Sequence, residues 1–88
     1  MNHRHRKLLH ALFSHPVPAN LDRRDVETLM GEIGASIDHS GHGRLMIRHG
    51  GHSVSLHASE HELSKDDVSH LKKFVEACGI DPVRDYPL

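Results

Sequence analysis

Hydrophobic residues recur every three or four positions near the start of the chain, which is the spacing of an amphipathic helix. We therefore expect a first helix over residues 3–14. Its apolar stripe consists of Leu8, Leu9, Leu12 and Phe13. Pro16 and Pro18 prevent the helix from continuing, because proline lacks the backbone N–H that a helix interior needs.

Two later segments show the same helical spacing. The second helix is expected to run from an N-cap at Asn20 or Asp22 to a stop at Gly34. The last helix is expected to begin at Ser64, where Asp67 completes a capping box three positions later. The two apolar stripes that these helices would bury are Val26, Leu29, Met30 and Ile33, and Val68, Leu71, Phe74, Val75 and Cys78.

Between these helices the apolar period changes from about four to two, which predicts strands. Three segments alternate in this way, over residues 35–39, 44–49 and 52–57. Turn residues separate them. Ser40-Gly41-His42-Gly43 forms the first turn, and Gly50-Gly51 is typical of a two-residue hairpin. A hairpin closed at Gly50-Gly51 has a fixed register, in which Arg44 pairs with His57.

This register sorts the hairpin side chains onto two faces. The face that helices should cover carries Leu45, Ile47, Val54 and Leu56. The opposite face should be open to water and carries Arg44, Met46, Arg48, Ser53, Ser55 and His57. The expected fold class is α+β. We expect a two-layer sandwich in α-α-β-β-β-α order, with a three-stranded antiparallel sheet and helices on one of its faces.

Composition fits one small domain over residues 1–88, with an N-terminal helix (1–15), a core (20–80) and a loose tail (81–88). Hydrophobic residues make up 36% of the chain and aromatic residues 3%, which argues against a deep internal pocket. The lone Cys78 excludes an intramolecular disulfide and fits a reducing compartment. No apolar run could span a membrane, and no secretory signal follows the basic N-terminus. We therefore expect a soluble cytoplasmic protein without a membrane partner.

Charge is unevenly distributed along the chain. The net charge of −1 argues against strong non-specific nucleic-acid binding, which needs many phosphate contacts. Basic residues nevertheless gather locally, and eleven histidines can add positive charge as the pH falls toward 6. The basic groups of the first quarter and of the central segment are Arg4, Arg6, Lys7, Arg23, Arg24, Arg44 and Arg48. Such patches can bind phosphate on a molecule that is neutral as a whole.

The exposed sheet face brings together groups that suit phosphodiester chemistry. Arg44 can bind a phosphate and stabilise developing charge, while the imidazole of His57 can accept a proton from a ribose 2′-hydroxyl. If the strand extends back through Gly43, His42 joins this face and can protonate the leaving oxygen. The catalytic candidates for metal-free RNA cleavage are therefore His57, Arg44 and His42. The RNA-binding candidates are Arg44, Arg48, Ser55 and Lys65, the last because it lies where a helix start can hold a phosphate.

Plainer interpretations stand beside these hypotheses. Arg44 and Arg48 could simply keep an exposed sheet soluble, and His57 could be an ordinary residue at a sheet edge. His42, His57 and His61 could instead form a metal site. The absence of a second cysteine and the loop between His57 and His61 weigh against a metal site, so no cofactor is expected.

The order of segments resembles the HicA toxin family. The strand Val54-Ser55-Leu56-His57, the helix start Glu62–Val68 and the helix end Phe74–Ile80 are similar to that family's strand, its Glu-Leu-Pro-Lys-type helix start and its Ala-Gly-(Ile/Val/Leu) ending. The N-terminal part, with Pro16–Asn20, resembles a longer sub-branch that carries an extra helix. The similarity extends from about Lys7 to Pro82, and its single motifs are short.

The resemblance implies a double-stranded-RNA-binding-like fold, ribosome-independent mRNA cleavage and neutralisation by a HicB-type antitoxin protein. In this family the catalytic histidine follows a Gly-Ser pair at the start of the second strand. Here that stretch reads His42-Gly43-Arg44, so Arg44 occupies the place of the histidine. Two hypotheses follow. Either His42 or His57 supplies the acid/base chemistry from the same face, or the chain binds RNA or a protein partner without cutting RNA.

Overall fold

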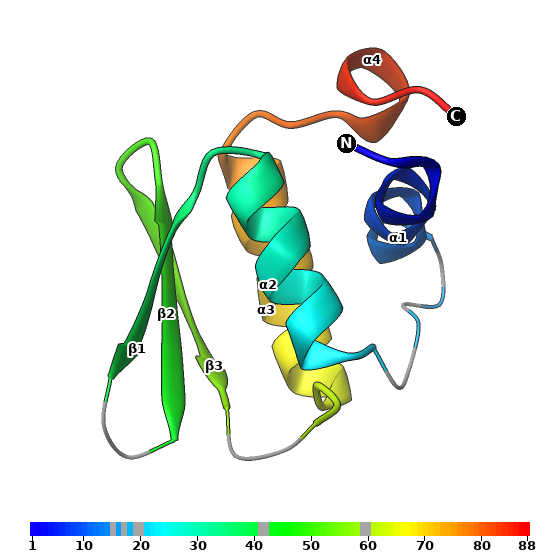
Figure 1. The fold of residues 1–88 in the computed structure, drawn as a ribbon. Helices are drawn as coiled ribbons and strands as arrows, with labels where there is room; N and C mark the ends of the chain where they lie inside the picture. Colours follow the sequence, from blue (N-terminus) through cyan, green and yellow to red (C-terminus); the bar gives the residue numbers. More distant parts are fainter. Residues whose placement is uncertain (15, 17, 19–20, 41–42, 59–60) are drawn as a thin grey trace.

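The alternating segments form a three-stranded antiparallel sheet with the strand order β1-β2-β3 (Figure 1). The computed structural model describes residues 1–14, 16, 18, 21–40, 43–58 and 61–88. Along the chain the elements are α1 (His3–Leu12), α2 (Arg23–Glu32), β1 (Ser36–Ser40), β2 (Arg44–His49), β3 (His52–His57), α3 (Lys65–Ala77) and α4 (Pro82–Asp85). The expected α+β class and the antiparallel sheet are confirmed.

Side-chain caps begin the three longer helices. Asn2 caps α1, Asp22 caps α2 and Ser64 caps α3, and each side chain accepts a hydrogen bond from a backbone N–H of the first turn. Asp22 is therefore a cap of the second helix, whereas Asn20 lies outside the described residues. Helix α1 ends at Leu12, two residues before the predicted end at Ser14, and β1 begins one residue later than predicted.

The predicted register of the β2–β3 hairpin is confirmed at every pair from His49–His52 to Arg44–His57. Gly50 and Gly51 have φ angles of 55° and 84°, the left-handed values that a tight hairpin turn of this kind requires. Strand β1 pairs with the other edge of β2, so that Ile37 lies beside Ile47. Because the register is fixed, the two faces of the sheet are fixed as well.

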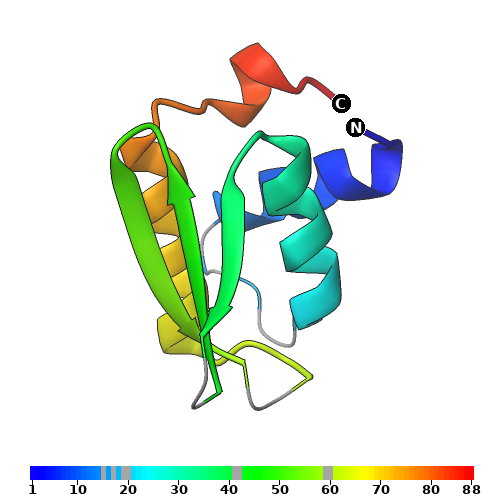
Figure 2. The same cartoon turned by 60° about the vertical axis from the view of Figure 1, so that its left-hand side comes forward.

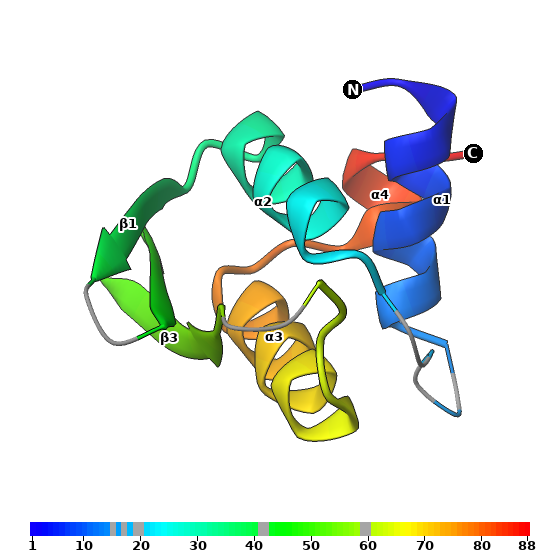
Figure 3. The same ribbon diagram turned by 60° about the horizontal axis from the view of Figure 1, so that its bottom comes forward.

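Helices α2 and α3 cover one face of the sheet, as predicted, but the helices form more than one layer. Helices α1 and α4 lie on the far side of α2 and α3 from the sheet (Figures 1 and 3). The two-layer description was therefore incomplete. The reason is that Leu9 and Leu12 of α1 are fully buried against the other helices. None of the helices in the described ranges has the length and apolar character needed to cross a bilayer.

The C-terminal tail, which was expected to be loose, contains the helical turn α4. Asp81 caps this turn by accepting hydrogen bonds from the backbone N–H groups of Val83 and Arg84. Pro82 is buried, and its fixed φ suits the first helical position. An imidazole nitrogen of His10 (Nε2) lies 2.7 Å from the carbonyl oxygen of Tyr86, which ties the tail to α1.

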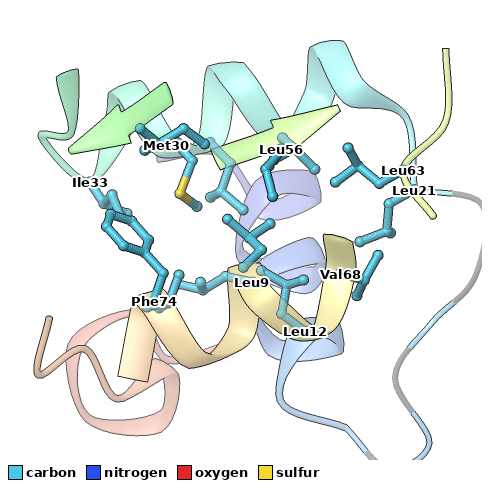
Figure 4. Close-up of a cluster of buried hydrophobic side chains, with 14 of the residues drawn as sticks. Leu9, Leu12, Leu21, Met30, Ile33, Leu56, Leu63, Val68 and Phe74 are labelled. Carbon is cyan, nitrogen blue, oxygen red and sulfur yellow. The ribbon is translucent and has the colours of Figure 1, made fainter. Parts of the chain in front are cut away.

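The hydrophobic core lies between the sheet and helices α2 and α3, and it continues to Leu9 and Leu12 of α1 (Figure 4). Leu45, Ile47 and Leu56 reach it from the sheet and are at most 1% exposed. Met30, Phe74 and further apolar side chains reach it from α2 and α3. One face of the sheet therefore packs against the core. The residues that alternate with these along each strand lie on the other face.

Candidate functional site

The sheet face that points away from the helices is the candidate site. We call it the open face, and it consists of Ser36, Asp38, Arg44, Met46, Arg48, Ser53, Ser55 and His57. No described helix or strand covers it (Figure 2). Met46 and Ser55 are half-buried and the other six residues are exposed. A partner molecule can therefore reach the open face without any rearrangement of the helices.

Arg44 and His57 are direct cross-strand partners at one end of the open face. The backbone N–H of His57 donates to Asp67 rather than to β2, at 3.0 Å, so the two residues form a non-hydrogen-bonded pair. Side chains approach each other more closely in such pairs than in hydrogen-bonded ones. The N–H of Ala58 donates to the carbonyl of Gly43 at 2.7 Å. Strand β2 nevertheless begins at Arg44, and Gly43 has a φ of 66°, so the extended geometry that would bring His42 onto this face does not continue through Gly43.

The imidazole of His57 is held by a buried carboxylate. Asp67, in the first turn of α3, is 2% exposed, whereas the His57 side chain is 69% exposed. The Nδ1 atom of His57 lies 3.2 Å from both carboxylate oxygens of Asp67. Asp67 is fixed in turn because its own N–H donates to the Ser64 hydroxyl at 3.1 Å. The helix start of α3 thus orients a histidine of the open face.

The sequence places Asp67 in a capping box with Ser64, and half of that prediction is correct. Ser64 accepts from the N–H of Asp67, but the carboxylate of Asp67 reaches β3 instead of returning to the N-cap. Capping boxes ordinarily use Glu or Gln at this position, because the longer side chain can turn back. The shorter aspartate was the one sequence feature that could have indicated a different partner.

Charge on the open face is mixed. The Nη1 atom of Arg44 donates to the hydroxyl of Ser55 at 3.3 Å, so the guanidinium lies toward β3. Arg48 is exposed near the hairpin tip, between Ser36 and Ser53. Asp38, which the sequence reasoning did not single out, pairs with Met46 and adds a carboxylate to the middle of the face. The open face therefore offers two cations, one imidazole and one anion.

Two predicted site residues, Lys65 and His42, are not among the described residues of the open face. Lys65 is exposed at the first position of α3, in the same helix turn as Asp67. His42 lies outside the described residues, so its place on this face stays a prediction. Within the described ranges, no group of three His, Cys, Asp or Glu side chains could hold a metal ion.

Comparison with known proteins identifies no relative of this chain. No protein-family model matches the chain, and no curated protein or solved structure matches it significantly.

Proposed function

We propose that this protein is an RNA-directed toxin of the HicA type, whose open face binds mRNA and cleaves it without a metal ion. One observation carries the proposal. The exposed imidazole of His57 is oriented by the buried carboxylate of Asp67 and lies directly opposite Arg44. When the 2′-hydroxyl of RNA attacks the adjacent phosphate, the reaction requires a general base held in one orientation and a cation that binds the phosphate.

The contact with Asp67 determines which imidazole nitrogen can act. A carboxylate only accepts hydrogen bonds, so the proton of a neutral His57 resides on Nδ1. The lone pair then resides on Nε2, which makes no hydrogen bond with the described residues. His57 can therefore accept a proton from a ribose 2′-hydroxyl, and Asp67 stabilises the imidazolium that forms.

The proposed reaction is an internal transfer at phosphorus. The 2′-oxygen loses its proton to His57 and forms a bond to phosphorus, while the bond from phosphorus to the 5′-oxygen breaks. The products are a 2′,3′-cyclic phosphate and a 5′-hydroxyl. The leaving oxygen takes its proton from water, or from His42 if that residue joins the open face. No oxidant, reductant or metal is needed.

Arg44 serves as the phosphate contact. The bond to Ser55 positions the guanidinium beside His57, and a planar guanidinium suits the oxygens of a phosphate. Arg48 and Lys65, both exposed, would contact flanking phosphates and add salt-dependent affinity. A HicB-type antitoxin would neutralise the protein by covering the open face.

A second candidate is a non-catalytic domain that binds RNA or a protein partner through the same face. The observation that favours it is the single imidazole among the described residues of the open face. Arg44 stands where the HicA family has its histidine, so a general acid is assigned only if His42 supplies it.

The test is incubation of the purified protein with a long unstructured RNA in the presence of EDTA. We expect cleavage, a reduction of about 10²- to 10⁴-fold in His57→Ala, and a large reduction in Arg44→Ala. His3→Ala is the matched control, because His3 is an exposed histidine on α1, on the far side of α2 and α3 from the sheet. RNA binding without cleavage would favour the second candidate. The absence of both would refute the proposal.

A further inference from the structure

We propose that Asp38 reads one base of a single-stranded RNA that lies along β2, and that it favours guanine at this position. The proposal rests on the proposed function and names the kind of RNA that the open face takes.

The cross-strand register arranges the open face in three rows. One end row holds Arg48 with Ser36 and Ser53, and the other holds Arg44 with His57. The middle row consists of Asp38, Met46 and Ser55. Neighbouring rows are two residues apart along a strand, which is about 7 Å.

This spacing suits an extended RNA strand. Arg44 and Arg48 lie about 13 Å apart along β2, since each residue of a strand advances about 3.3 Å. Phosphates held at these two cations would be separated by about two nucleotide steps of an extended strand. The nucleotide between them would then lie over the middle row. The same strand would have its scissile phosphate at Arg44 and His57.

Asp38 is exposed in this middle row, and its carboxylate makes no hydrogen bond or ion pair with the described residues. A carboxylate repels phosphate, so it directs the RNA backbone toward β2 and β3. It can only accept hydrogen bonds, and the base edges of RNA provide donors. Asp38 therefore faces a base rather than the backbone.

Guanine matches a carboxylate better than the other bases do. Its Watson–Crick edge presents two adjacent donors, N1–H and N2–H, to the two carboxylate oxygens. Adenine and cytosine present one amino group on this edge, and uracil presents one imino group. These edges are accessible only in unpaired RNA, so the preferred substrate is single-stranded.

Met46 offers the base an apolar contact beside Asp38. It is half-buried in the middle of the face, directly beside Asp38 across the β1–β2 pairing. A thioether side chain is polarisable and makes favourable contacts with ring edges and faces. Contact with Met46 would hold any base at this position, while Asp38 selects among the bases.

The experiment is sequencing of cleavage junctions from a random-sequence single-stranded RNA pool, with EDTA present. The parent protein, Asp38→Asn and Asp38→Ala are compared. Asp66→Asn is the matched control, because it removes the same charge from an exposed aspartate on α3. We expect a guanine preference of about 5- to 150-fold at one position within two nucleotides of the scissile bond. The preference should be lost in both Asp38 variants and retained in Asp66→Asn.

Other outcomes overturn the inference in distinguishable ways. Cleavage with the same base profile in the parent and in Asp38→Asn would mean that Asp38 does not read a base, while the proposed function would stand. Faster cleavage of every sequence in Asp38→Asn, without a change in preference, would assign Asp38 to repulsion alone. Absence of both cleavage and RNA binding in the parent protein would refute the proposed function together with this inference.

Discussion

Asp67→Asn separates the structural role of Asp67 from its chemical role. The backbone N–H of His57, which donates to the carboxylate of Asp67 at 3.0 Å, can donate to the amide oxygen of asparagine instead. The hydrogen bond to Ser64 is also kept, because its donor is the backbone N–H of residue 67. The amide nitrogen is a donor, however, and it would face Nδ1 of His57. The imidazole would then favour a proton on Nε2, and its lone pair would no longer point to the substrate.

The two effects differ in expected size. Loss of one charge-assisted hydrogen bond of an exposed imidazole costs about 1–2 kcal/mol of unfolding free energy. For a domain of this length, that lowers the midpoint of thermal unfolding by several degrees, at about 4–8 °C per kcal/mol. Loss of a correctly oriented base costs about 10²- to 10⁴-fold in cleavage rate.

Both quantities are measured on the same preparation, by thermal unfolding and by RNA cleavage in EDTA at a temperature where the variant is folded. Asp66→Asn should leave cleavage unchanged and should lower the unfolding midpoint less than Asp67→Asn, because it removes only an exposed charge in the first turn of α3, whose interaction with the helix dipole is worth about 0.3–1 kcal/mol. A lower unfolding midpoint with unchanged cleavage would refute the role of Asp67 in orienting His57. Asp67 would then serve only as a structural contact between β3 and α3.

Three further predictions concern binding, packing and pH. Arg48→Ala should weaken RNA binding, lower the slope of log affinity against log salt by about 0.7, and leave cleavage of bound RNA unchanged, as measured by fluorescence anisotropy and single-turnover kinetics. Leu9→Ala should destabilise the protein by about 2–5 kcal/mol in urea unfolding, because Leu9 is fully buried. Val83→Ala, at a residue that is 73% exposed, should change stability by less than about 0.5 kcal/mol. The hydrogen bond from Arg84 lowers the pKa of Asp85 from its ordinary value of 3.8 to about 2. This contribution is fully present above pH 3.8 and is lost as the pH falls through 2, so Asp85→Asn should destabilise the protein at pH 7 and should no longer do so well below pH 2.

The hairpin could be predicted from sequence because all its determinants are local. Gly50 and Gly51 permit the left-handed turn, and the alternation on both sides allows only one register with a continuous apolar face. The caps at Asp22 and Ser64 are local for the same reason. The composition of the open face on β2 and β3 followed directly from these features.

The position of α1 could not be predicted in the same way. Its apolar stripe indicates that Leu9 and Leu12 are buried, but it does not indicate against which element. The structure places α1 on the helices rather than on the sheet, where Arg4 Nη2 lies 2.6 Å from a carboxylate oxygen of Asp25. His5 also contacts Glu32 on α2. These pairs join residues that are distant in sequence, so their partners become evident only in the folded chain.

The contact between His57 and Asp67 also joins residues that lie apart in the sequence, and the proposed chemistry depends on it. Burying a carboxylate costs free energy unless hydrogen bonds compensate it. A neutral asparagine could accept the backbone N–H of His57 without burying a charge, and Ser64 alone would suffice to cap α3. The charge of Asp67 faces the imidazole of His57, which is mostly exposed and therefore contributes little to the core. Residues that stability alone would not favour, such as this buried charge, are typical of functional sites. We therefore expect the chemistry at the His57 end of the open face.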